Sequence, residues 1–178
     1  MKTCLTLFLL ILTTVTLQAQ TQMYLEIPGI EGESTVNRFE DQIVIDAFVF
    51  SAESPKSKVV SGRTRSTVQF SGMSIVKKTD AATNPMLQAL TRNQRFDEMV
   101  LSLINTSGAQ GAAPYLVYTL SNVVISSYDV EVTLEDSKPR ESWILEYETL
   151  NAVYTKMERD GSAGDTNEFE YKIKTAQN

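Results

Sequence analysis

Apolar and polar residues alternate in several short stretches of the chain, and turn-forming residues separate these stretches. Trp143, Leu145 and Tyr147 alternate with polar residues, and the segment 169–173 repeats the pattern near the C-terminus. Because successive side chains of a β-strand point to opposite faces, this period predicts strands with one face on a core and the other in water. Many such strands with turns between them predict a mainly β domain, built as a sandwich or a barrel.

Further strands are expected where β-branched and aromatic residues gather. Together with the stretches above, they cover residues 23–27, 43–50, 68–76, 99–104, 115–127, 130–134 and 143–155. The stretch 43–50 is almost wholly apolar, which is typical of a strand covered on both faces. It is therefore expected to run through the core.

One short helix is expected near Asn84 and Pro85. An asparagine side chain can cap free backbone amides, and a proline in the first turn of a helix loses no hydrogen bond. Met86, Leu87 and Leu90 then form an apolar helix face.

The first 19 residues have the pattern of a secretory signal peptide. Lys2 supplies the positive charge, residues 5–17 form the apolar run, and the small residue Ala19 is a suitable cleavage point. The run is shorter than the roughly 20 apolar residues that a membrane-spanning helix needs. We therefore expect residues 1–19 to be removed and residues 20–178 to form one exported domain, periplasmic or extracellular, with no membrane insertion. Cys4 is the only cysteine, so the mature domain has no thiol.

Composition argues against several classes of function. The chain has a net charge of −6, which becomes −7 when Lys2 is lost, and such a surface repels nucleic acid and anionic membranes. Without histidine, and without cysteine after cleavage, the domain lacks the commonest general base, the commonest metal ligand and the most reactive nucleophile. The acid pairs Glu146/Glu148 and Glu168/Glu170 fall on the polar positions of alternating strands and are interpreted as solvated charge. We expect no enzyme activity, no metal and no cofactor.

Residues 51–65 interrupt the strand pattern with a long polar loop. The loop carries four cations in an acidic chain, namely Lys56, Lys58, Arg63 and Arg65. One interpretation is a solvated loop, and the other is an arm that docks on an acidic surface of a neighbouring subunit.

Four segments together resemble the Hcp (haemolysin-coregulated protein) family, the tube proteins of bacterial type VI secretion. They are MYLEIPGIEGEST at 23–35, FSGMSIVKKTDAATNPMLQAL at 70–90, YLVYTLSNVVISSYDV at 115–130 and ESWILEYETLNAVYTKM at 141–157. They follow the family's order and span nearly all of the mature chain. The resemblance implies a barrel of two packed antiparallel sheets with one short α-helix. It also implies six-membered rings that stack into a tube, without catalysis.

The resemblance therefore favours a structural protein whose main partner is itself, with secreted effectors or other components of a secretion apparatus as further partners. In the family, the extended loop reaches toward the neighbouring ring. The residues expected at such a contact are Lys56, Lys58, Arg63 and Arg65 on one ring and Glu131, Glu135 and Asp136 on the next. The alternative is a secreted binding module, monomeric or oligomeric, that has the same fold and no connection to a secretion apparatus.

Overall fold

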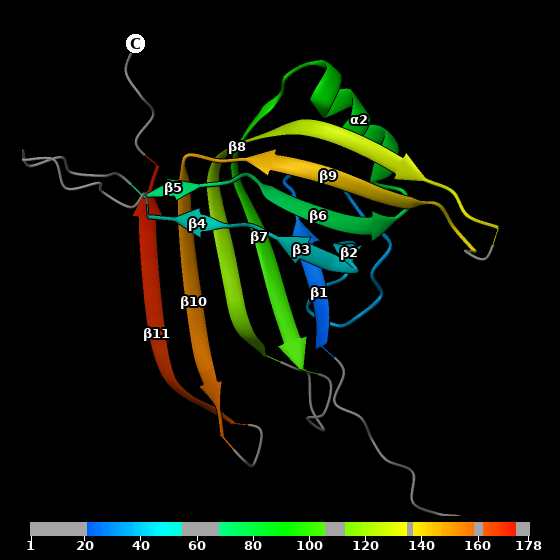
Figure 1. The fold of residues 1–178 in the computed structure, drawn as a ribbon. Helices are drawn as coiled ribbons and strands as arrows, with labels where there is room; N and C mark the ends of the chain where they lie inside the picture. Colours follow the sequence, from blue (N-terminus) through cyan, green and yellow to red (C-terminus); the bar gives the residue numbers. More distant parts are fainter. Residues whose placement is uncertain (1–20, 55–67, 106–112, 135–136, 159–161, 174–178) are drawn as a thin grey trace, which may run out of the picture.

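The computed structural model describes residues 21–54, 68–105, 113–134, 137–158 and 162–173, which form antiparallel strands and one helix (Figure 1). The strands are β1 (Thr21–Glu26), β2 (Ile43–Ile45), β3 (Ala47–Val49), β4 (Ala52–Glu53), β5 (Gln69–Phe70), β6 (Met73–Lys78), β7 (Arg95–Asn105), β8 (Pro114–Glu131), β9 (Arg140–Glu146), β10 (Thr149–Met157) and β11 (Ala163–Lys172). The helix is α2 (Thr83–Thr91). The prediction of a mainly β fold with one short helix is confirmed for this part of the chain.

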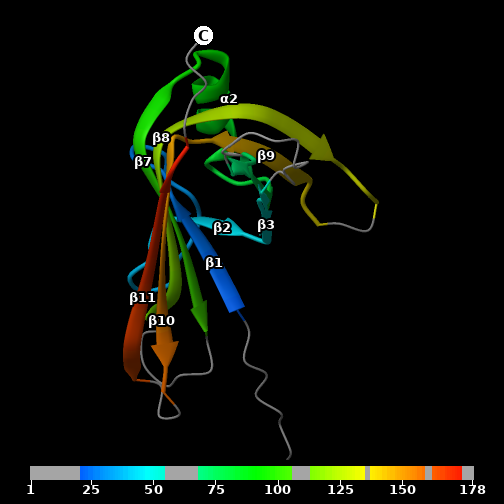
Figure 2. The same ribbon diagram turned by 60° about the vertical axis from the view of Figure 1, so that its left-hand side comes forward.

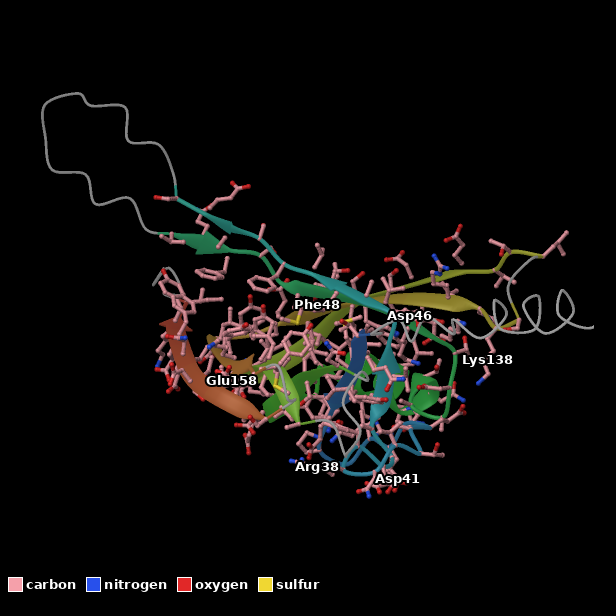
Figure 3. All side chains as sticks on the ribbon, turned by 90° about the horizontal axis from the view of Figure 1, so that it is seen from below. Arg38, Asp41, Asp46, Phe48, Lys138 and Glu158 are labelled. Atoms are coloured by element: carbon pink, nitrogen blue, oxygen red, sulfur yellow. The ribbon has the colours of Figure 1, made fainter. Side chains whose placement is uncertain are left out.

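Nine strands form one hydrogen-bonded sheet, in which the order β2-β1-β7-β8-β9-β6-β3 is extended by β10 on β8 and by β11 on β10. Strand β8 is 18 residues long and pairs with β10 near its start and with β9 near its end. Seen from below, β11, β10 and β8 lie opposite the ribbon that contains β3 and β6 (Figure 3). The two expected layers are thus two parts of one sheet.

The two ends of the strand order, β2 and β3, follow each other in the chain with only Asp46 between them. Residues 43–45 pair with β1, and residues 47–49 pair with β6. The backbone N–H of Asp46 donates to the carbonyl oxygen of Val76 on β6 at 2.8 Å. One bent segment therefore bridges the first and last strands of the order.

The core lies between these layers and contains the apolar face predicted around Trp143. Trp143 and Leu145 are completely buried, Tyr147 is nearly so, and Glu146 is exposed. Full burial of such a face stabilises the fold by about 1.5–3 kcal/mol for each large side chain. The alternation read from residues 143–147 therefore predicted the core correctly.

Two other predictions about burial are wrong. On the bent segment 43–49, Ile43 and Ile45 are buried, but Val49 is 68% exposed, because no described element covers the outer face of β3. In β11, Phe169 was expected on the core and is 51% exposed, because the sheet extends beyond the enclosed core at this point (Figure 2).

Helix α2 begins at Thr83, two residues earlier than predicted, and Asn84 is not its cap. Ala82 occupies the N-cap position without a side-chain hydrogen bond. Asp80 takes the capping role instead, because its carboxylate accepts the N–H of Ala82 at 3.0 Å and its carbonyl accepts the N–H of Thr83 at 3.2 Å. Pro85 lies in the first turn, where its missing N–H costs nothing.

Candidate assembly surfaces

The structure leaves the predicted contact between rings untested. The four cations of the basic loop, and Glu135 and Asp136, lie outside the described residues. Glu131 is described: it is the last residue of β8, its side chain is exposed, and it lies opposite Arg140 of β9. The charge contact between copies therefore stays a prediction.

The short β4–β5 ribbon and the β8–β9 hairpin extend toward opposite ends of the molecule (Figures 1 and 3). The ribbon is fixed to the end of β11, because the ring of Phe70 stacks on that of Tyr171 at 4.6 Å between centroids. The Tyr171 hydroxyl also donates to the carbonyl of Val68 at 3.2 Å. We call residues 55–67, which contain the four cations, the basic segment. The described residues on either side of it, Ser54 beside β4 and Val68 beside β5, thus lie at the end of the molecule opposite the hairpin.

The β8–β9 hairpin carries a row of exposed apolar side chains, Val130, Val132 and Leu134, which we call the hairpin stripe. Val132 is 72% exposed, and Leu134 is fully exposed. The row continues the inner face of β8, since Tyr128, two residues before Val130, packs against Trp143 at 4.4 Å between ring centroids. The core-facing side of the sheet therefore continues into solvent along the hairpin.

At the other end of β8 the same inner face is again only partly covered. Its cross-strand neighbours form a patch of Leu116, Tyr118, Ala152, Tyr154 and Phe169, which we call the open face. Tyr154 is 46% exposed, and the other four side chains range from partly buried to half exposed. Figure 3 looks toward this end of the molecule, and β11 forms its margin.

Strand β11 lies at the edge of the sheet. It pairs with β10 over most of its length and with no other described strand. Most of its side chains are exposed on both faces. An exposed edge of this length presents a row of unpaired amides and carbonyls, which is a template for pairing with another chain.

A cluster of buried charges ties β6, β9 and the start of α2 together. The Lys77 ammonium is fully buried and donates to Asp80 at 2.6 Å, to Glu141 at 3.0 Å and to the Thr83 hydroxyl at 3.1 Å. The Thr83 hydroxyl in turn donates to Glu141, as do the Thr79 hydroxyl and the indole N–H of Trp143. The Lys77 ammonium is thus surrounded by acceptors, which indicates a structural role.

Burial alone would raise the pKa of Glu141, because it disfavours the charged carboxylate. Hydrogen bonds from Lys77, Thr79 and Thr83 outweigh that effect, and the pKa of Glu141 lies below its ordinary value. This cluster was missed in the sequence. A signal was available, because Lys77 and Glu141 occupy the core-facing positions of alternating strands, next to Ile75 and Trp143.

Two grooves, of about 420 and 350 Å³, lie beside β2 and share Glu33, Val44 and Asp46 in their lining. Lys138 donates to Glu33 at 3.0 Å, and this contact lowers the pKa of the exposed Glu33 carboxyl. Within the described residues, no group of three or more acidic, histidine or cysteine side chains is placed to hold a metal ion. No helix in the same part of the chain is long and apolar enough to cross a membrane.

These features define an antiparallel β protein with a free sheet edge and uncovered apolar surfaces, a class suited to contact with other protein chains. The sequence profile described as "Type VI secretion system effector, Hcp" matches residues 24–154. The chain belongs to the Hcp family. A search of curated proteins gives no match.

Solved structures show the same fold. The chain is similar to a structure described as a type six secretion system protein, with a TM-score of 0.77, 21% identity, and coverage of 86% of this chain and 96% of that one. Hcp1 from Salmonella typhimurium gives a TM-score of 0.70, 18% identity, and coverage of 87% and 95%. A type VI secretion system effector from Yersinia pestis gives 0.66, 20% identity, and coverage of 85% and 99%.

Proposed function

We propose that residues 20–178 form a non-enzymatic structural protein that self-assembles into rings, six-membered as in the tube proteins of its family. The observation that carries this proposal is the free edge of β11, which leaves ladder donors and acceptors without described partners. Pairing with a second copy satisfies these groups and hides the edge from other chains. The bent segment through Asp46 connects the first and last strands of the order, which supports a closed barrel in which β11 is the edge left for assembly.

The purified domain should be an oligomer. Analytical ultracentrifugation should give a mass several times that of one chain, and electron microscopy should show rings. The same sample, taken from the exported fraction, should lack residues 1–19 by mass spectrometry, as expected of a cleaved leader. A strict monomer at high protein concentration would contradict the proposal and would favour a secreted binding module.

We propose further that rings stack through the basic segment. In support, the described strands on either side of this segment, β4 and β5, form a ribbon at one end of the molecule, and the hairpin whose first strand ends at Glu131 extends toward the opposite end (Figure 1). A head-to-tail arrangement of two rings therefore brings unlike charges together. Each exposed pair contributes only about 0–1 kcal/mol and is screened by salt, so stacking depends on several pairs.

Reversing Lys56, Lys58, Arg63 and Arg65 to glutamate should abolish stacking and leave rings intact. Raising the salt concentration should weaken stacking in the same way, while ring formation, held by apolar contacts and strand pairing, persists. Sizing and electron microscopy report both levels of assembly. The matched control carries the same change of charge at four exposed cations outside β10 and β11, namely Arg38, Lys78, Arg92 and Arg95. Tubes that survive both the reversal and high salt would show that the segment is a solvated loop.

A further inference from the structure

The hairpin stripe and the open face are two extensions of one apolar surface. Along β8, Leu120, Val123 and Ile125 point into the core and are completely or almost completely buried. Beyond them the inner face reaches the hairpin stripe in one direction and the open face in the other. The buried core therefore ends before the apolar side of the sheet does, at both ends of its longest strand.

The described part of the chain leaves both extensions partly uncovered. The hairpin projects away from the barrel, and the open face lies toward the other end of the sheet (Figures 1 and 2). The rings of Phe48 and Phe50 cover Tyr118 at one margin of the open face, at 5.5 and 5.6 Å between centroids, whereas Tyr154, Phe169 and the hairpin stripe stay exposed. Large exposed apolar surfaces usually mark contacts with other proteins. A contact between copies covers both at once, because each copy offers a projecting stripe and a receiving face.

The dimensions of the two surfaces agree. β8 ends at Glu131, and the four residue steps from Val130 to Leu134 span at most about 13–14 Å when fully extended. The open face spans β8, β10 and β11, which at about 4.8 Å between strands places its outer strands about 10 Å apart. A single projecting ribbon can therefore lie against it.

The charges also favour a second copy as the occupant. Neither surface contains a charged side chain, although the chain as a whole has a net charge of −6. Two copies that meet through these surfaces avoid both the mutual repulsion of their acidic faces and the cost of removing charges from water.

We infer that the hairpin stripe of one copy docks on the open face of the next copy within the same ring. This inference rests on the proposed self-assembly and names the surfaces that make it. The contact joins two different surfaces, so repetition generates a ring when the rotation closes. It is separate from the basic segment, which acts between rings.

Cysteine cross-linking tests this contact directly, because the mature domain contains no thiol of its own. Val132→Cys and Tyr154→Cys, placed in one chain and oxidised, should give a ladder of covalent multimers that ends at the size of the ring. Both positions are substantially exposed, so the variants should fold, and thermal melts of the reduced proteins check this. The control pair is Val49→Cys and Tyr154→Cys. It keeps the cysteine at position 154 and moves the other one to Val49, a similarly exposed valine on the outer face of β3, and it should give no ladder.

A second measurement does not depend on disulfide geometry. Val132→Glu together with Leu134→Glu should weaken self-association at least about tenfold, measured by sedimentation, because a buried charge would replace an apolar contact. The wild type could be oligomeric while the cysteine pair gives no ladder and the two glutamates leave self-association unchanged. That result would overturn the inference and leave the proposed function standing. Covalent dimers from Val132→Cys alone, with no longer products from the pair, would also overturn it, since they indicate a symmetric hairpin contact. A wild-type chain that is always monomeric would overturn both.

Discussion

Replacing Lys77 with methionine should lower the free energy of unfolding by about 3–5 kcal/mol at neutral pH. The substitution keeps the length of the side chain and removes the ammonium that holds Asp80 and Glu141 at 2.6 and 3.0 Å. Both carboxylates would then be buried, or nearly so, without a cation. Urea denaturation followed by tryptophan fluorescence measures the change, since Trp143 is the only tryptophan.

The control for this prediction is Lys138→Met, which removes the ion pair with Glu33. That pair is half exposed on both sides, so its loss should cost no more than about 1 kcal/mol. Equal effects of the two substitutions would contradict a special role for the buried cluster.

The cost of Lys77→Met should also depend on pH. Because the pKa of Glu141 in the folded protein lies below the ordinary value of 4.5, the wild-type cluster stabilises the fold above that value. This contribution is lost as pH falls from about 4.5 through the lower folded pKa. The difference between wild type and Lys77→Met should therefore shrink in acid, where the carboxylates left behind become neutral.

Trp143→Ala should also destabilise the fold strongly, by about 3–5 kcal/mol, because the indole is completely buried and its loss leaves a cavity. The indole N–H donates to Glu141 at 3.2 Å, so the substitution also removes one donor from the charge cluster. Chemical denaturation followed by far-ultraviolet circular dichroism measures the change, because the variant lacks the fluorescent reporter.

Trp143→Phe separates the two contributions. It keeps most of the apolar volume and loses only the N–H donor, and a lost hydrogen bond to a charged group costs about 1.5–3 kcal/mol. A near-neutral Trp143→Ala would contradict the description of this face as core.

The sequence predicted the elements whose pattern depends only on local alternation. Trp143, Leu145 and Tyr147 read correctly as one buried face, because β9 is packed on that side by the rest of its own chain. The Hcp family was also recognisable from segments spread along the mature chain, and the match over residues 24–154 confirms it.

The sequence could not predict features that depend on what lies across the sheet. Val49 lies in an apolar run and Phe169 in an alternating one, yet both are exposed because no described element packs on their side. Lys77 and Glu141 present the opposite case. They lie on β6 and β9, which are far apart in the sequence but paired in the sheet, and each can be buried because the other supplies the opposite charge. The N-cap was missed for a similar reason, since Asp80 reaches forward to Ala82 from outside the helix.

The order of the strands has a consequence for how the domain folds. Strands β7, β8, β9 and β10 follow one another in the chain, and β8 pairs with the other three. These contacts close short loops and can form early. Strand β1, by contrast, pairs with β7 across the whole first half of the domain, and contacts between such distant residues form slowly. The N-terminal strand should therefore join last, and until it does the growing sheet has a second open edge beside β7, which makes this step the one most exposed to aggregation.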